Sequence, residues 1–365
     1  MAYRAVIARL RRRLHTALLG GVMLLTSTSG AQAFSYLFAE GQGASTVTHP
    51  RGYTGTGGNF ALTIGIDPAS LFASEMVIST QNVIQIWNEL QPTVGNVLTL
   101  GEIGKFDFES VLLHELAHAL GLEHPNLGSE SGFADGRTEY TRTSRGSNGA
   151  YDLNAGPDGV PGSSDDQRGD DVNLNWFAIG SNNPFQVSAV IDSSTYSLLP
   201  SQLPSGHTSS ANASRQVAAI TPGVLANTEA VMQQGTFLNE AQRTLGHDDV
   251  AGIRYAMAGV DGIAGTSDDY TFRINYAGLT TAADVTIKFD NSQTSFAVTK
   301  YTASRIGTTS HLTLDTSQIY LNSTQPWHFN QTPIPEPASG ALLLGAVGWL
   351  LSHRRREKAS PRQPA

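Results

Sequence analysis

One stretch of this chain, residues 114–124, restricts its fold more than any other feature. It reads His-Glu-Leu-Ala-His-Ala-Leu-Gly-Leu-Glu-His. On a helix, His114 and His118 are four positions apart and lie on one face, where both imidazoles can reach one metal ion. Gly121 can adopt a positive φ, which lets the helix end and the chain turn back. That turn would bring His124 to the same ion as a third ligand.

The chemistry of this stretch predicts a catalytic metal site. Three neutral imidazoles that leave one position for water are typical of catalytic zinc, whereas structural zinc sites have four protein ligands. Glu115 follows the first histidine and is suited to act as general base on a metal-bound water. The alternative is a solvated helix with three unrelated histidines. The added glycine and histidine at fixed offsets favour the metal site.

The pattern His-Glu-x-x-His-x-x-Gly-x-x-His resembles that of the metzincin zinc endopeptidases. A second stretch, 245–253, is similar to the Asp-Asp-Val-x-Gly-Ile signature that opens the last helix of the matrixin branch. The resemblance implies an α+β catalytic domain with a twisted sheet, a backing helix, a zinc helix and a C-terminal helix. It also implies that His114, His118 and His124 bind zinc, with Glu115 as the base.

The same resemblance implies a methionine turn beneath the metal. In matrixins this turn lies shortly before the second signature, so Met232 is the methionine expected there. Met257 is the rival, but it lies at helical spacing within the last helix, where core packing explains it better. Asp248 or Asp249 is expected to cap that helix.

Two segments before the zinc helix have clear periodicity. Residues 60–66 alternate between apolar and small or polar types, which predicts a half-buried strand. Apolar residues at helical spacing over 76–90 predict a helix, and the resemblance to metzincins implies that this helix backs the sheet. The zinc helix should begin near Asp107 or Ser110, either of which could cap it. We expect the catalytic domain to span 34–257, with an insertion at about 125–231 that is rich in Gly, Ser, Asn and Asp.

An acidic motif occurs twice, at 155–166 and 258–269. Its pattern is Ala-Gly-x-Asp-Gly-x-x-Gly-[Ser/Thr]-Ser-Asp-Asp. Clustered carboxylates on glycine-bent loops suit calcium, which prefers several oxygen ligands. A pair of polar β-turns is the alternative. The candidate calcium ligands are Asp158, Asp165, Asp166, Asp261, Asp268 and Asp269.

The last part of the body has the alternation of β-strands. Apolar and aromatic residues alternate over 270–276 and again over 285–289. Together with the second acidic loop, these strands predict a small β-rich module at 258–331. Such a module could bind polysaccharide or pack on the catalytic domain.

The N-terminal end is typical of a secretory signal peptide. Residues 1–33 carry five arginines and no acidic residue, then a short apolar run and Ala31-Gln32-Ala33 as a small-x-small cleavage site. The mature chain would begin near Phe34.

The C-terminal segment 332–365 has three parts. Pro335-Glu336-Pro337 precedes an apolar run at 338–351, and three arginines follow. This tail resembles the PEP-CTERM sorting signal of Gram-negative bacteria, which implies processing by an exosortase. It also implies transient membrane association, and a location at the cell surface or in the extracellular matrix after anchoring in the inner membrane. A eukaryotic glycolipid-anchor signal and a plain C-terminal anchor are alternatives.

Charge and cysteine content exclude several classes. The formal net charge is −8 although both ends are basic, so the region between them is more acidic still. Such a surface suits cations and repels nucleic acid. The absence of cysteine excludes disulfides, thiolate ligands and cysteine nucleophiles.

Two hypotheses of function follow. The first is an exported zinc endopeptidase that acts on a protein or peptide substrate. The second is a calcium-stabilised surface or matrix-binding protein with little or no proteolytic activity.

Overall fold

The structure is a computed structural model, and it describes the residues in these ranges: 34–43, 45–93, 95–124, 128–131, 138–141, 153–154, 167–168, 176–179, 188–199, 202, 230–232, 236, 238–292 and 295–335. The predicted signal peptide, most of the predicted insertion and the apolar segment of the predicted sorting tail lie outside these ranges. Within them, no helix has both the length and the apolar character needed to cross a bilayer.

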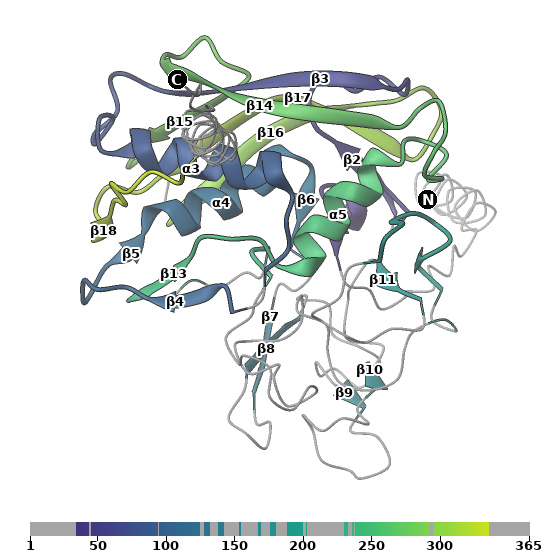
Figure 1. Cartoon of the computed structure of the whole chain (residues 1–365), viewed down its shortest axis with the longest axis horizontal. Helices are drawn as coiled ribbons and strands as arrows, with labels where there is room; N and C mark the ends of the chain where they lie inside the picture. Colours follow the sequence, from purple (N-terminus) through teal and green to yellow (C-terminus); the bar gives the residue numbers. More distant parts are fainter. Residues whose placement is uncertain are drawn as a thin grey trace, which may run out of the picture.

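A six-stranded sheet forms one layer of the molecule (Figure 1). The order is β14-β3-β15-β17-β16, and β2 pairs with the beginning of β17. All pairings are parallel except that of β16 with β17, which is antiparallel. The strands are β2 (Val47–His49), β3 (Gly58–Ile66), β14 (Tyr270–Leu279), β15 (Val285–Phe289), β16 (Ala297–Arg305) and β17 (His311–Leu321).

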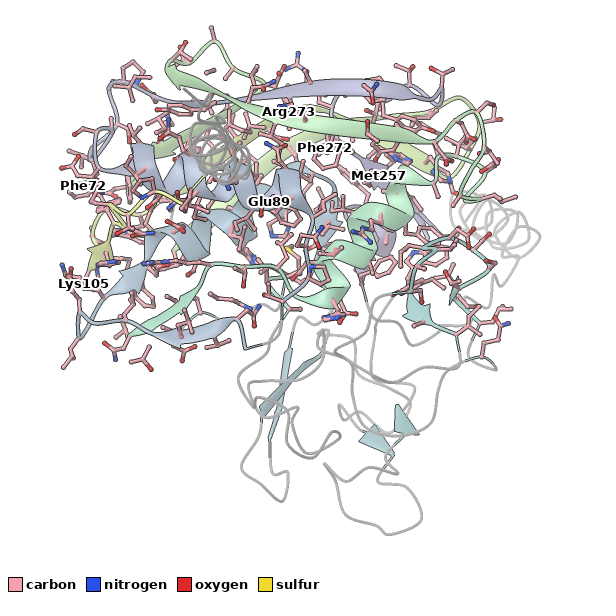
Figure 2. All side chains as sticks on the ribbon, viewed as in Figure 1. Phe72, Glu89, Lys105, Met257, Phe272 and Arg273 are labelled. Atoms are coloured by element: carbon pink, nitrogen blue, oxygen red, sulfur yellow. The ribbon has the colours of Figure 1, made fainter. Side chains whose placement is uncertain are left out.

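Alternation of side chains gives this sheet one buried and one exposed face. On β14, Ile274 is buried, Phe272 packs against the core, and Arg273 between them is exposed (Figure 2). Successive side chains of a strand point to opposite faces, so polar residues at every second position face solvent on the outer side of the sheet. The strand predicted at 60–66 is confirmed as part of β3.

Three helices lie on the inner side of the sheet: α3 (Met76–Glu89), α4 (Phe108–Ala119) and α5 (His247–Met257) (Figure 1). The short helix α2 (Ala39–Gln42) lies near the start of the described chain. Trp87 of α3 is fully buried and donates its indole N–H to the carbonyl oxygen of Leu113 at 3.2 Å, which joins α3 to α4. The predicted helices at 76–90 and after Asp107 are confirmed.

The strands predicted for the β-rich module at 258–331 share one sheet with β3 of the predicted catalytic domain. β14 and β15 pair with β3 on its two sides, so strands from both halves of the chain form one sheet. Ile274, Ile287 and Ile319 belong to the same core cluster as the residues of α3 and α4. Alternation identifies a strand but not its partner. In the described chain β3 pairs with no strand that precedes residue 258.

Short two-stranded pairings complete the fold. They are β1 (Ser35–Tyr36) with β6 (Leu122–Glu123), β4 (Val97–Thr99) with β13 (Glu240–Gln242), β5 (Phe106–Asp107) with β18 (Trp327–His328), β7 (Gly128–Ser131) with β8 (Thr138–Thr141), β9 (Leu153–Asn154) with β10 (Gln167–Arg168), and β11 (Phe177–Ala178) with β12 (Tyr196–Ser197). After β18 the chain runs along α3, where the amide of Asn82 bonds to the carbonyl oxygen of Thr332 and to the N–H of Ile334, both at 2.9 Å.

Candidate metal centre

Helix α4, which carries the first two histidines, begins at Asp107. The carboxylate of Asp107 accepts the backbone N–H of Ser110 at 3.1 Å, as an N-cap residue does. Arg243 donates two further hydrogen bonds to this carboxylate, at 2.9 and 2.7 Å. Asp107, rather than Ser110, is therefore the N-cap residue of α4. Its contact with Arg243, which follows β13, connects the start of α4 to that strand.

The end of α4 depends on Gly121. Its φ is +106°, in the region that favours glycine. A Cβ at this position would lie 2.2 Å from the carbonyl oxygen of Thr48, so the neighbouring backbone excludes any side chain. The predicted turn at Gly121 is confirmed, and β6 follows it and leads directly to His124.

The first described residues of the chain hold this turn in place. β1 pairs antiparallel with β6, with Ser35 opposite Glu123, and the N–H of Leu37 donates to the carbonyl oxygen of Gly121 at 3.0 Å. The buried Tyr36 donates its hydroxyl to the carbonyl oxygen of Gly252 on α5 at 2.6 Å. The sequence contained no signal for this pairing, because two-residue strands have no recognisable period.

The three imidazoles meet at one place. The candidate ligand atoms of His114, His118 and His124 all lie within 4.8 Å of one another. The Nε2 atoms of His114 and His124 are 2.9 Å apart. In the described part of the chain, no other group of three His, Asp or Glu side chains is arranged to hold a metal ion.

Backbone carbonyl groups orient two of these rings. Nδ1 of His114 lies 2.6 Å from the carbonyl oxygen of Val231, and Nδ1 of His118 lies 2.8 Å from that of Leu122. We assign the ring proton to Nδ1 in both, because a carbonyl oxygen can only accept. Nε2 then presents its lone pair to the centre of the cluster, as metal-bound histidines commonly do.

Burial also keeps these two histidines neutral. Loss of solvation lowers the pKa of His114 to about 3, with a further contribution from neighbouring His118. The same loss lowers the pKa of His118 to about 4. Only a neutral imidazole can bind a metal, so both ligands are ready at neutral pH without loss of a proton.

Glu115 follows His114 on α4 and is buried, with 5% of its surface exposed. Its Oε2 accepts the hydroxyl of Thr299 on β16 at 2.6 Å. Burial raises the pKa of Glu115 to about 7, and the hydrogen bond from Thr299 opposes that rise. A carboxyl group with such a pKa can both take up and release a proton near neutral pH.

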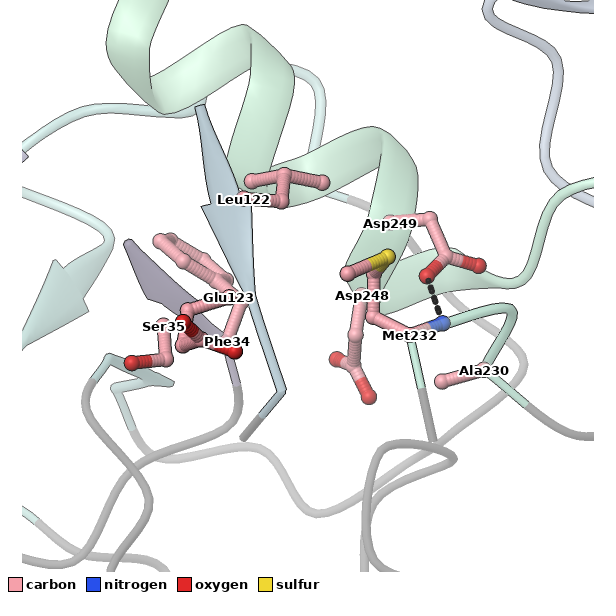
Figure 3. Close-up of a pocket in the computed structure, with 8 residues that line it drawn as sticks. All are labelled: Phe34, Ser35, Leu122, Glu123, Ala230, Met232, Asp248 and Asp249. Atoms are coloured by element: carbon pink, nitrogen blue, oxygen red, sulfur yellow. Dashed lines mark hydrogen bonds between the residues drawn. The ribbon is translucent and has the colours of Figure 1, made fainter. Parts of the chain in front are cut away.

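Met232 lies in a buried turn next to the site, with 3% of its surface exposed. The N–H of Val231 donates to one carboxylate oxygen of Asp249 at 2.8 Å. The N–H of Met232 donates to the other oxygen at 3.0 Å (Figure 3). Val231 is the residue whose carbonyl oxygen contacts His114, so Asp249 of α5 helps to hold that ligand through the turn. The rival Met257 is only partly buried, on the last turn of α5.

Asp249 does not cap α5 in the way that the sequence suggested. The N-cap residue is Gly246, and Asp249 lies one turn later and accepts the N–H of Gly246 at 2.7 Å. Its role in the turn was missed, because the turn and α5 are joined by a segment without periodicity. The sequence signal for Asp249 is its place three residues after the N-cap residue Gly246, as in a capping box.

The second acidic loop is described and the first is not. Asp268 accepts the N–H of Val260 at 2.7 Å, and Asp269 accepts that of Gly265 at 2.6 Å. Asp261 accepts the N–H of Ile263 at 2.8 Å. The hydroxyl oxygen of Thr266 lies 2.6 Å from the second oxygen of Asp268 and 3.2 Å from that of Asp269. Asp261, Asp268 and Asp269 do not come together as a group that could hold a metal ion in this structure, and calcium binding by this loop stays a prediction. The other candidates, Asp158, Asp165 and Asp166, lie outside the described residues.

Comparison of this chain with models of protein families, with curated proteins and with solved structures finds no match. The arrangement of residues is therefore the basis on which its function is inferred.

Proposed function

We propose that this protein is an exported zinc-dependent endopeptidase of the metzincin type. The observation that carries the proposal is the convergence of three imidazoles, two of them kept neutral by burial, with the buried Glu115 next to the first of them on α4. Three histidine ligands and an adjacent acid are the parts that metal-assisted hydrolysis requires.

The donor set fits zinc. His114, His118 and His124 would hold the ion, and imidazole nitrogen is a common zinc ligand. In His114 and His118 the Nδ1 atoms are engaged with carbonyl oxygens, so the Nε2 atoms remain for the metal. Three protein ligands leave a position open, which catalytic sites need and structural sites lack.

The reaction follows from the position and protonation of Glu115. A bound zinc ion supplies Lewis acidity, which polarises a carbonyl group and lowers the pKa of water. Glu115 takes a proton from the attacking water and later gives it to the leaving amine. In the metal-free protein burial raises the pKa of Glu115 to about 7. A bound zinc ion would lower this pKa and favour the carboxylate form, which is the form that a general base needs.

The edge of the sheet suggests how a substrate would lie. In the described part of the chain, β16 pairs with β17 on one side and with no strand on the other. Thr299 of β16 contacts Glu115, so the free edge of this strand is near the catalytic base. An extended peptide could add to that edge through main-chain hydrogen bonds, which favours a protein or peptide substrate.

The ends of the chain support export as part of the proposal. The basic and apolar segment at 1–33 is typical of a secretory signal, and the tail at 332–365 resembles a PEP-CTERM signal. We infer that an exosortase-type enzyme processes the tail and that the protein acts at the cell surface or in the extracellular matrix.

The second candidate function is a calcium-stabilised surface or matrix-binding protein. The repeated acidic motif favours it, because two copies of a carboxylate-rich loop suit a hard cation. This candidate needs neither Glu115 nor zinc, so one experiment separates the two.

The test is metal analysis and proteolysis with the purified protein. We expect one zinc per chain and cleavage of an unfolded protein substrate that a zinc chelator abolishes. Glu115→Gln should keep the zinc and lose activity by about 100-fold or more, the range of general base catalysis. A protein with no bound zinc, or a Glu115→Gln variant as active as the wild type, would rule out the proposed function.

A further inference from the structure

Thr299 contacts the proposed base from a strand that the zinc-binding motif does not include. It lies on β16, and 6% of its surface is exposed. Its hydroxyl oxygen is 2.6 Å from Oε2 of Glu115 and 2.9 Å from the backbone carbonyl oxygen of the same residue. We infer that Thr299 is a positioning residue that holds the Glu115 carboxylate in one orientation for catalysis. This inference rests on the proposed function.

The orientation of Glu115 needs such a partner. The last side-chain torsion of a glutamate has broad, weakly defined minima, so packing alone does not fix the direction of its oxygens. Of the described side chains, Thr299 is the one that hydrogen-bonds this carboxyl group. Both residues are almost fully buried, so a water molecule could not easily replace the hydroxyl. With Oε2 held by Thr299, the direction of Oε1 is set as well.

The same hydrogen bond relates the base to the substrate. A general base must lie within about 2.6–3.2 Å of the atom that it deprotonates. Thr299 belongs to the edge strand on which we place the peptide, so its hydroxyl fixes Glu115 relative to the bond to be cleaved. Small errors in such placement lower the rate without weakening the binding of substrate.

The kinetic test uses three variants of the full chain. Thr299→Val removes the hydroxyl and keeps the shape, Thr299→Ser keeps the hydroxyl, and Thr316→Val is the matched control. Thr316 lies on β17, and its hydroxyl bonds to Thr302 at 2.7 Å on the exposed face. We expect kcat of Thr299→Val to fall by about 10- to 100-fold, the range for loss of a hydrogen bond to a charged group. KM and zinc content should stay within about twofold, while Thr299→Ser stays within about threefold in kcat and Thr316→Val is unchanged.

A second readout does not depend on activity. In a crystal structure of metal-free Thr299→Val, the Glu115 carboxyl group should leave its wild-type position or occupy more than one. A wild-type kcat in Thr299→Val, a kcat of Thr299→Ser as low as that of Thr299→Val, or an unmoved carboxyl group would each overturn the inference. An inactive wild type would instead contradict the proposed function and this inference with it. Thermal unfolding of each variant shows whether a lower kcat is caused by unfolding of the protein rather than by loss of the hydrogen bond.

Discussion

The orientation of the metal ligands depends on main-chain groups outside the motif. The carbonyl oxygen that contacts His114 belongs to Val231, which is 117 positions away. The carbonyl oxygen that contacts His118 belongs to Leu122, in the strand that follows the glycine turn. Because a carbonyl oxygen can only accept a hydrogen bond, it stabilises the Nδ1–H tautomer of each ring. Main-chain groups, and not side chains, therefore set the tautomers of these two ligands.

The first prediction concerns Gly121. Gly121→Ala should destabilise the protein by roughly 3 kcal/mol or more and abolish zinc binding, because the new Cβ would meet the carbonyl oxygen of Thr48 and force the turn open. Chemical denaturation and zinc titration measure the two effects. Gly265→Ala is the control, since Gly265 has a φ of +92° and no neighbour within 4 Å of a Cβ. It should cost only about 1 kcal/mol and leave zinc affinity unchanged. Equal effects of the two substitutions would show that contact with Thr48 is unimportant.

At the scale of elements, β1 supports β6 and thereby the third ligand. The pairing of Tyr36 with Leu122 holds the segment that carries both the carbonyl group for His118 and the approach to His124. The side chain of Phe34 packs within 6 Å of the rings of Tyr36 and Tyr255, measured between ring centroids. The first residues expected in the mature chain therefore support the strand that leads to His124.

The second prediction follows from that support. Removal of residues 34–36 should weaken zinc binding by about tenfold or more, because β6 loses its partner and His124 is no longer held near the other ligands. Titration with a zinc-buffering chelator measures the affinity. Removal of the residues after Pro335 provides the comparison and should leave zinc affinity unchanged. An N-terminal deletion that binds zinc as tightly as the whole chain would show that β1 is dispensable.

At the scale of the whole molecule, the sheet joins the two halves of the chain. β3 lies between β14 and β15, and both of these strands follow α5 in sequence. Pairing of residues so far apart in sequence costs loop-closure entropy, and the sheet is complete only when both halves of the chain contribute their strands. The protein should therefore fold as one unit.

The third prediction is that a fragment ending at residue 257 will not fold. It would retain every residue of the zinc-binding motif but lose four of the six strands of the sheet. We expect no cooperative thermal transition and no tight zinc binding, whereas a chain ending at Pro335 should show both. Circular dichroism and zinc titration are sufficient measurements. A cooperatively folded, zinc-binding fragment would show that residues 34–257 form a domain without the strands at 258–331.

The fourth prediction concerns acid. His49 and His311 form a buried pair with 2.8 Å between Nε2 of the first and Nδ1 of the second, and burial lowers the pKa of both. The unfolded chain takes up protons below pH of about 6.5, whereas the folded chain resists them, so these groups stabilise the fold above that pH and lose the effect as pH falls. The ligands His114 and His118 act in the same direction in the metal-free protein.

Buried acids oppose this effect but are fewer. Burial raises the pKa of Glu115 to about 7 and that of Asp249 to about 6, and it also raises the pKa of Glu109. Each of these groups stabilises the fold as pH falls. The four histidines outnumber them, so the free energy of unfolding of the metal-free protein should decrease between pH 6.5 and 5.5, by about 1.4 kcal/mol per pH unit for each net proton. Urea denaturation at pH 7.5, 6.5 and 5.5 tests this, and equal or greater stability at pH 5.5 would contradict it.

Much of the local structure could be predicted from the sequence. The periodicity of 76–90 and of 60–66 identified a helix and a strand, and the offsets in 114–124 identified a helix, a glycine turn and three histidines that converge. These features depend on neighbours within a few positions in the chain, which is the range over which side-chain spacing and backbone preference act.

The partners of those elements could not be predicted in the same way. No local pattern states that β3 pairs with strands some two hundred residues later, that Thr299 meets Glu115, or that Asp249 holds the turn behind His114. Such pairings are decided by which surfaces can be buried together once the chain is compact, and that choice depends on all elements at once. The sequence by itself thus determined the identity and local geometry of the histidine cluster, and the tertiary structure decided what orients it.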